Sequence, residues 1–300
     1  MVRVITIVLN WNRCADTLAC LASVRAMTYS TEIVVIDNGS TDESVATIRA
    51  AYPDVTILET GMNLGYAAGN NVGFDYVRQQ TNSDAILLLN NDTIAAPEML
   101  TQLTAEYEAM EGKAVIGPEV RYADEPRIIW CAGGRIDWWR GYTTNIGIGM
   151  EAQEPAPPAA DVPFVVGCAM LIPIVALQRI GGFDSRYFMY WEEVDWCIRA
   201  QKAGYRARVV PKAVLYHKVP RGDERPSPRV LYYLTRNRLV LLRTHLPWYR
   251  QPLALSWTLW GLMRTGLDLL QRRDWRREQA LVRGILDAAR GKTGISRVAW

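Results

Sequence analysis

The fold is decided by residues 32–42, which read EIVVIDNGSTD. Four apolar, β-branched residues form a short buried strand that ends at Asp37, and the turn residues after it lead into a helix. Two other stretches have the same form, namely residues 2–12, VRVITIVLNWN, and residues 85–92, AILLLNND. A repeated apolar strand that ends in polar residues predicts an α/β fold, with a mostly parallel sheet covered by helices on both faces.

Helical patterns separate these strands along the chain. We expect strands at residues 2–9, 32–36, 55–58 and 85–89, and helices at residues 14–27 and 67–80. In a parallel sheet the carboxyl ends of the strands meet at one edge, where ligands bind. At that edge Asp37 can accept hydrogen bonds from a base or ribose, and Asp92 can bind a hard cation that prefers oxygen ligands.

The second half of the chain adds elements around an acidic segment. We expect strands at residues 164–172, 206–210 and 213–216, a helix at 191–203 and a surface loop at 151–163. Glu192, Glu193 and Asp195 lie in an aromatic stretch, where burial makes a carboxylate more basic. On a helix Glu192 and Asp195 share one face and Glu193 points about 100° away, so we expect different roles for the three. One of them is suited to be a general base that removes a hydroxyl proton.

Charge divides the chain into two regions. Residues 1–198 contain 12 Lys and Arg and 25 Asp and Glu, whereas residues 199–300 contain 22 and 6, so the net charges are −13 and +16. The basic tail also has apolar stretches at 230–246 and 253–270, with tryptophans next to arginines. This composition is typical of a helix that lies in the headgroup layer of a membrane. Ordinary packing, dimerisation and a membrane span are the alternatives, and Arg264 disfavours the span.

Composition excludes several classes of protein. Hydrophobic residues make up 49% and charged residues 22%, which excludes a disordered chain. An odd number of cysteines, five, without a C-x-x-C pair disfavours a disulfide framework or zinc knuckle and favours the cytoplasm. The glycines at 65, 69 and 73 do not have the spacing of a dinucleotide fingerprint. The basic tail lacks a recognisable nucleic-acid module, so we expect no nucleic-acid partner.

Several motifs occur in a fixed order along residues 2–220. They are VLNWN at 8–12, IDNGSTD at 36–42, Asn63-x-Gly65 with Gly69-x-Asn71, LNND at 89–92, GGFD at 181–184, FMY at 188–190, EEVDWCIR at 192–199, and His217. This series resembles the family 2 glycosyltransferases, and within them the rhamnosyltransferase-like branch of bacterial surface polysaccharide synthesis. The resemblance implies a GT-A nucleotide-diphospho-sugar transferase fold over residues 1–220. Residues 221–300 then form a basic, amphipathic helical region for contact with a membrane surface or a second subunit.

The resemblance also implies roles for particular residues. Asp92 would coordinate Mg²⁺ or Mn²⁺ on the donor diphosphate with His217, and Asn90 stands where the family has the first Asp of its Asp-x-Asp motif. The catalytic base falls on Glu193, with Glu192 and Asp195 as further candidates or partners. The nucleotide and the sugar would be bound by residues at the sheet edge and in the sugar pocket. These donor-binding residues are Leu9, Asn10, Asn12, Asp37, Asn38, Asn63, Gly65, Asn71, Asn90, Asn91, Gly167 and Ala169.

The implied activity is that of an inverting, metal-dependent glycosyltransferase. It would move a sugar such as rhamnose from a UDP- or dTDP-linked donor to a polyprenyl-linked or polysaccharide acceptor. The implied location is cytoplasmic, peripheral on the inner face of the cell membrane. A homodimer is a further partner that the resemblance allows. The alternative is a GT-A-like protein that binds a nucleotide sugar or a glycan without turnover. Asn90 supports that alternative, and the intact Glu193 disfavours it.

Overall fold

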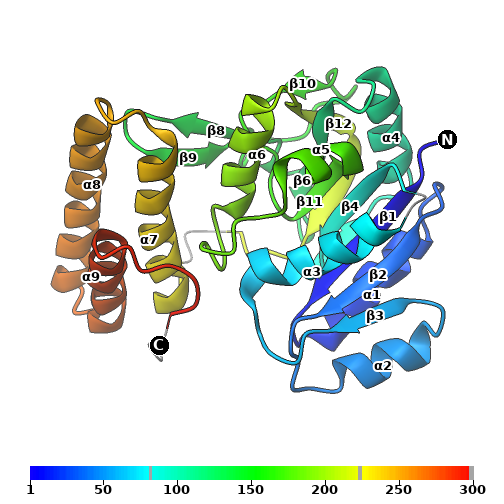
Figure 1. Cartoon of the computed structure of the whole chain (residues 1–300), viewed down its shortest axis with the longest axis horizontal. Helices are drawn as coiled ribbons and strands as arrows, with labels where there is room; N and C mark the ends of the chain where they lie inside the picture. The colour runs from blue at the N-terminus through cyan, green and yellow to red at the C-terminus, as the bar shows by residue number, and fades with distance from the viewer. Residues whose placement is uncertain (81–82, 222–224, 297–300) are drawn as a thin grey trace.

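The first third of the chain alternates between strands and helices in the computed structural model, which describes residues 1–80, 83–221 and 225–296 (Figure 1). The elements are β1 (Val4–Asn10), α1 (Cys14–Arg25), β2 (Glu32–Asp37), α2 (Ser44–Ala51), β3 (Thr56–Glu59), α3 (Gly65–Gln79) and β4 (Ala85–Asn90). Each strand and helix for which we gave bounds here lies within two residues of the prediction. The strand signals were strong because β1 and β4 are buried almost throughout and therefore read as continuous apolar runs.

The middle of the chain holds the remaining strands and shorter helices. They are β5 (Thr93–Ala95), α4 (Met99–Ala109), β6 (Ala114–Tyr122), β7 (Ile129–Cys131), β8 (Gly134–Asp137), β9 (Tyr142–Asn145), β10 (Ala160–Asp161), β11 (Ala169–Pro173), α5 (Ile174–Ile180), α6 (Glu192–Lys202) and β12 (Arg206–His217). The predictions differ from the structure in three places. Only the second half of the strand expected at 164–172 forms, as β11. The two strands expected at 206–216 are one strand with a register shift between Val210 and Val214, and the expected loop at 151–163 contains β10.

The described strands include one large sheet with the main order β10-β12-β6-β11-β4-β1-β2-β3. Strands β4, β1, β2 and β3 are parallel, β11 is antiparallel to both β4 and β6, and β12 is parallel to β6. The register aligns Asn10 with Asp37 and Leu9 with Asn90. On the other side, β5 pairs with β12 so that His217 lies opposite Thr93, next to Asp92 in the chain. The sheet thus collects the predicted polar residues at one edge.

Both faces of the sheet are covered, as predicted. Phe74 and Val77 of α3 and Trp196 of α6 pack on one face of the sheet with Ile7 and Leu88. The opposite core contains side chains of α1, α2 and α4 with alternate residues of the same strands. Its members include Leu21, Ile48, Leu103, Val8, Val35 and Leu87.

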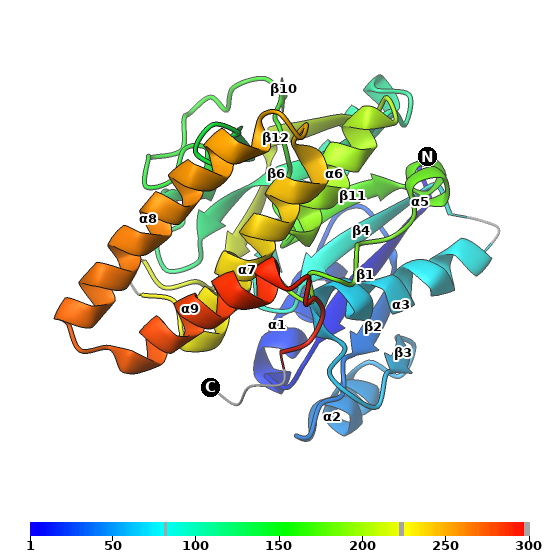
Figure 2. The ribbon, with the colours of Figure 1, turned by 60° about the vertical axis from the view of Figure 1, so that its left-hand side comes forward.

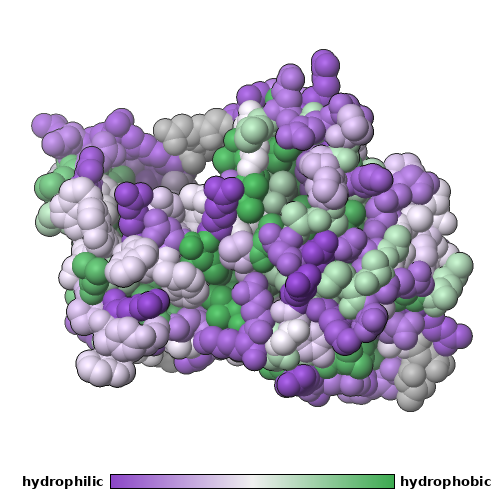
Figure 3. All heavy atoms as spheres, turned by 90° about the horizontal axis from the view of Figure 1, so that it is seen from above, coloured by the Kyte–Doolittle hydropathy of each residue, from purple (hydrophilic) through white to green (hydrophobic). Residues whose placement is uncertain are grey.

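The C-terminal region consists of helices beside this core (Figures 1 and 2). They are α7 (Pro228–His245), α8 (Gln251–Gln271) and α9 (Trp275–Ala289). The apolar stretches at 230–246 and 253–270 lie mostly in α7 and α8, as expected for a helical C-terminal region, and we predicted no bounds for α9. Leu239 of α7 packs with Leu262 of α8 and Leu281 of α9. Figure 3 shows hydrophobic residues, in green, between this region on the left and the remainder of the chain. Within the described residues, no helix has the combined length and hydropathy for a membrane span.

Candidate active site

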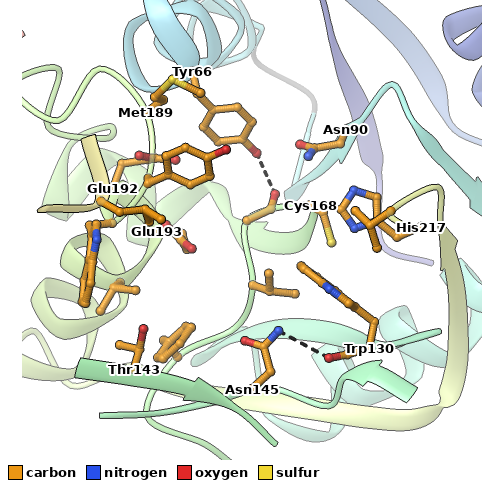
Figure 4. A pocket seen from close by; sticks show the side chains of 18 of the residues that line it. Tyr66, Asn90, Trp130, Thr143, Asn145, Cys168, Met189, Glu192, Glu193 and His217 are labelled. Carbon is orange, nitrogen blue, oxygen red and sulfur yellow. Dashed lines mark hydrogen bonds between the residues drawn. The ribbon is translucent and has the colours of Figure 1, made fainter. Parts of the chain in front are cut away.

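A cavity of about 560 Å³ opens at the carboxyl edge of the sheet, between the first turn of α6 and the end of β12 (Figure 4). Of the residues predicted to be functional, it is lined by Asn90, Asp92, Gly167, Glu192, Glu193 and His217. In Figure 4 the glutamates project from one side, and Asn90 and His217 lie on the opposite side. The structure therefore brings together residues that are up to 127 positions apart in the chain.

The two glutamates are the first residues of α6, and the cavity lies off the first turn of that helix. Glu192 is buried, and in both residues the Oε2 atom is buried without a hydrogen-bond partner among the described residues. Burial and the neighbouring charge of Glu193 raise the pKa of Glu192 well above its usual value, and burial also raises the pKa of Glu193. A carboxylate in this setting has an increased affinity for a proton, as a general base requires.

Asp195 lies outside the cavity. Its carboxylate accepts hydrogen bonds from Arg199 Nε at 2.7 Å and pairs with His245 Nε2 of α7 at 2.7 Å. Burial alone would raise the pKa of Asp195, but the hydrogen bond from His245 and the charge of Arg199 lower it below its usual value. Glu192 and Asp195, which we expected on one helix face, therefore do not line the cavity together. Because both Glu192 and Glu193 lie at the helix start, their long side chains reach the cavity together, and the catalytic role of Asp195 stays a prediction.

Asp92, His217 and Asn90 offer ligands of the kind a divalent cation takes. Asp92 Oδ1 is 3.2 Å from His217 Nε2, and the Oδ1 atom of Asn90 is buried with no partner in the described ranges. No group of three or more His, Cys, Asp and Glu that could hold a metal occurs among the described residues. A carboxylate, an imidazole and a free amide oxygen nevertheless fit a cation whose other ligands are phosphate and water. The charge arrangement around Asp92 is consistent with this fit.

Burial raises the pKa of Asp92, but the hydrogen bond and charge of His217 and the charge of Arg13 outweigh it and lower the pKa. Arg13 Nη1 lies 3.4 Å from Asp92 Oδ2. Lys218, directly after His217, donates from Nζ to Asp16 Oδ1 at 2.8 Å, and Arg13 Nε is 2.8 Å from the other oxygen of Asp16. These two cations beside the proposed diphosphate position were missed in the sequence, although each directly follows a predicted site residue.

The predicted residues at the ends of β1 and β2 bond mainly to one another. Asn10 Nδ2 donates to Asp37 Oδ1 at 2.8 Å, and the Ser40 amide donates to Asp37 Oδ2 at 3.0 Å. Asn12 Oδ1 accepts from the Thr41 amide at 2.9 Å. Leu9 is part of the buried core at 9% exposure. These contacts fix the shape of the sheet edge on which Asp37 stands.

Asn38, Asn63 and Gly65 form a second set of contacts next to the first. Asn38 Nδ2 donates to Gly65 O at 3.1 Å, and the Gly65 amide donates to Asn63 Oδ1 at 2.8 Å. Gly65 has φ +84°, and a Cβ atom there would lie 2.5 Å from the carbonyl oxygen of Phe188. Only glycine therefore allows the start of α3 to approach the aromatic segment before α6.

The remaining predicted donor residues have different surroundings. Asn71 donates to Phe183 O and accepts from Phe183 N, both at 2.8 Å. Asn91 Nδ2 donates to Thr17 Oγ1 at 2.9 Å. Ala169 is buried in β11 opposite Leu89 and does not line the cavity. Gly167 does line it, and its carbonyl accepts a hydrogen bond from the Tyr66 hydroxyl at 2.7 Å.

The cavity also has walls that the sequence did not reveal. Trp130, Thr143 and Asn145 come from β7 and β9, and Leu234 comes from α7. The Trp130 ring contacts the His217 imidazole edge-on, with centroids 4.8 Å apart. β7 and β9 are short strands of mixed polarity. Their sequences have no strong hydrophobic period from which the strands could have been predicted.

A mostly parallel sheet with antiparallel strands β5, β7, β10 and β11, and a cavity at its carboxyl edge lined by two glutamates of α6, is the arrangement of the GT-A fold. The model of glycosyl transferase family 2 matches residues 5–180, and the chain belongs to that family. It is a glycosyltransferase.

Named relatives refine this assignment. Over 266 residues, the chain is 29% identical to the N-acetylglucosaminyl-diphospho-decaprenol L-rhamnosyltransferase of Mycobacterium tuberculosis, covering 82% of this chain and 85% of that protein. It is 22% identical to the dTDP-rhamnosyl transferase RfbF of Shigella flexneri, covering 88% of each. Among solved structures, the mannosyltransferase PcManGT of Pyrobaculum calidifontis, in complex with GDP-Man and Mn²⁺, matches with a TM-score of 0.57 and 17% identity, over 97% of this chain and 88% of that one. The structural match supports the fold.

Proposed function

We propose that the protein is an inverting, metal-dependent glycosyltransferase that transfers rhamnose from a nucleotide-diphosphate donor to a lipid-linked acceptor. The observation that carries the proposal is the cavity in which Glu192 and Glu193 face Asn90, Asp92 and His217. Buried carboxylates on one side of the cavity and a carboxylate, an imidazole and an amide oxygen on the other support a base and a cation site that face each other. Both rhamnosyltransferase relatives above cover most of this chain, which supports rhamnose as the sugar.

Glu193 is the general base in this proposal. The two adjacent carboxylates titrate as a pair, and burial raises the pKa of both. Within the pair, Glu193 is the carboxylate that accepts the acceptor hydroxyl proton, because it stands at the position of the catalytic carboxylate in the family motif. The deprotonated oxygen attacks the anomeric carbon from the side opposite the diphosphate, which inverts that centre.

Asp92, His217 and the free amide oxygen of Asn90 hold the cation in this proposal. Bound Mg²⁺ or Mn²⁺ would offset the negative charge on the departing nucleoside diphosphate. Arg13 and Lys218 lie at the same edge and contribute further positive charge next to Asp92. The PcManGT structure contains Mn²⁺ with its nucleotide sugar, which supports this choice of cation.

The test is calorimetry of the full-length protein with UDP and with dTDP, each with and without Mn²⁺. We expect metal-dependent binding of one nucleotide, and transfer from the matching sugar donor to a polyprenyl-diphosphate acceptor. Retention of donor binding in Glu193→Gln together with loss of transfer would support the assigned base. Failure of both nucleotides to bind under every metal condition would contradict the proposal.

Binding without turnover is the second candidate, and Asn90 is the observation that favours it. An amide in place of the first carboxylate removes one charge from the cation site. The transfer assay with the matching sugar donor distinguishes the two candidates, since a binding protein would take up the nucleotide sugar with no release of free nucleotide over hours. The paired glutamates in the cavity favour the enzyme.

Residues 221–300 are proposed as a region that holds the catalytic unit of residues 1–220 on the inner membrane face. α8 exposes Trp257, Trp260 and Met263, each at least 45% exposed. The Arg264 guanidinium lies over the Trp260 ring at 5.0 Å. Exposed tryptophans with arginines and a net charge of +16 over residues 199–300 suit an anionic lipid surface.

Flotation with vesicles tests this contact. We expect the protein to float with phosphatidylglycerol vesicles and the double variant Trp257→Ser/Trp260→Ser to float much less. The control is Val175→Ser on α5, which removes a 55% exposed apolar side chain from another helix. A stable dimer in solution that the double variant dissociates, with unchanged flotation, would assign the α8 face to a second subunit.

A further inference from the structure

The segment that leads into the two cavity glutamates has an unusual backbone. Phe188, Tyr190 and Trp191 have φ angles of 65, 66 and 77°. Residues other than glycine rarely adopt this left-handed backbone region because it costs free energy. The conformation therefore persists only where neighbouring groups hold it. The next residue is Glu192, the start of α6. The path of residues 187–191 therefore sets the position of both carboxylates.

One side chain of α7 holds this segment through its carbonyl groups. Asn237 is fully buried, and its Nδ2 donates to Tyr187 O at 2.8 Å, Met189 O at 2.8 Å and Tyr190 O at 3.0 Å. An amide nitrogen has two N–H bonds, so three carbonyls share two donors. Carbonyls that point toward one another in this way need a buried donor between them.

The preceding residue holds the Asn237 amide in place. Arg236 is 1% exposed and donates from Nε to Asn237 Oδ1 at 2.9 Å. This bond orients the amide with its nitrogen toward the segment. Arg236 Nη2 also donates to Tyr187 O at 2.9 Å and to Arg186 O at 3.2 Å, and its Nη1 donates to Gly294 O at 2.6 Å.

The same helix also contacts α6 itself. His245, near the end of α7, pairs with Asp195 at 2.7 Å, and both side chains are at most 3% exposed. Asp195 is two residues beyond Glu193 in the chain. α7 therefore fixes the segment before the glutamates and the first turn that carries them.

We propose that Asn237 is a positioning residue for Glu192 and Glu193, so that α7 completes the active site from the C-terminal region. Asn237 does not line the cavity, and it acts on the reaction only through the carbonyls of residues 187–190. The chemistry of the two glutamates rests on the proposed function, whereas the structural part of the inference does not.

The variants are Asn237→Ala and, as a control matched for buried position on the same helix, Leu239→Ala. Leu239 is 4% exposed and packs against α8 and α9, away from the segment. We expect Asn237→Ala to lower kcat by about 100-fold through displacement of the carboxylates, with the nucleotide Kd within about threefold of wild type. Leu239→Ala should lower stability and leave kcat within about threefold. Asn237→Ser keeps one donor and should have an intermediate kcat.

Hydrogen exchange of the amides of residues 187–195 separates this inference from the proposed function. We expect faster exchange there in Asn237→Ala than in Leu239→Ala, even if the wild type transferred no sugar. Equal kcat in the two alanine variants, or equal exchange over residues 187–195, would overturn the positioning role. If Asn237→Ala does not fold, the comparison of Asn237→Ser with Leu239→Ala decides between the same outcomes.

Discussion

Predicted site residues lie both at the ends of strands β1 and β2 and in the cavity at α6. The two regions differ in whether the polar side-chain atoms have hydrogen-bond partners within the protein. At the strand ends, Asn10 and Asp37 bond to each other and to nearby turn residues. In the cavity, Glu192, Glu193 and Asn90 each leave a buried oxygen without a partner among the described residues. Buried unpaired atoms are costly, so they persist where a ligand or a proton completes them. The comparison separates residues that build the edge from residues that are free to act.

The largest expected effect is on kcat, from a substitution in the cavity, where buried oxygens lack partners among the described residues. Glu193→Gln keeps the size of the side chain but removes its ability to accept a proton. We expect kcat to fall by a factor on the order of 10²–10⁴, measured as release of free nucleotide, with an unchanged nucleotide Kd. Glu192→Gln is the matched control and should lose less. A larger loss in Glu192→Gln would exchange the roles of the two glutamates.

The next effect concerns the cation ligands. Asp92→Asn removes the carboxylate that pairs with His217. Loss of even an outer partner of a metal site costs roughly 10–100-fold in affinity, so we expect at least about tenfold weaker nucleotide binding in the presence of Mn²⁺. Calorimetry without Mn²⁺ is the control and should show little change. An equal loss with and without Mn²⁺ would mean that Asp92 acts on the nucleotide directly.

A smaller effect, on stability, is expected for a predicted site residue whose polar atoms are already hydrogen-bonded within the protein. Asn71→Ala leaves both the N–H and the carbonyl of Phe183 without their partner. Each unpaired buried group costs about 1–3 kcal/mol, so the free energy of unfolding should fall by about that amount or somewhat more in urea titrations. The nucleotide Kd should stay unchanged. Weaker nucleotide binding at full stability would support the donor-binding role predicted from the motif.

The smallest effect is a shift of pH dependence. Because the pKa of Glu193 is raised above its usual value by burial, the base becomes protonated, and inactive, at a higher pH than an exposed glutamate. We therefore expect kcat/KM to fall as the pH is lowered, by about tenfold per pH unit below that pKa. In Glu192→Gln the neighbouring like charge is absent, so the acid limb should move to lower pH. An acid limb that does not move would show that the two carboxylates titrate independently.

The parallel half of the fold could be predicted because its strands are buried on both faces. A continuous apolar run such as residues 85–89 is too short for a typical helix and is followed by polar turn residues, and both features favour a buried strand over a buried helix. Strands β7, β8 and β9 have three or four residues each and carry no such signal. Their place in the fold depends on tertiary contacts, which local sequence does not encode.

The candidate site could be predicted in part for a similar reason. Glu192, Glu193, Asp92 and His217 stand in motifs, and the sheet brings them to one cavity. The helical wheel assigned Glu192 and Asp195 to one face, but it could not show that the cavity lies off the helix start. The role of Asn237 could not be predicted from the sequence. Its partners are backbone carbonyls about 50 residues away, and every residue has a carbonyl group, so these partners have no sequence signature.

The bond from Arg236 to the carbonyl of Gly294 has a consequence for biosynthesis. Strands β1 to β4 can pair as soon as residue 90 has left the ribosome, whereas Arg236 meets Gly294 only about a hundred residues after Glu193 has been translated. At typical translation rates of about 5–20 residues per second, that interval lasts roughly 5–20 s. A nascent chain can thus form the sheet edge that carries Asp37 and Asn90 well before the bond between Arg236 and Gly294 completes the contacts that hold Asn237.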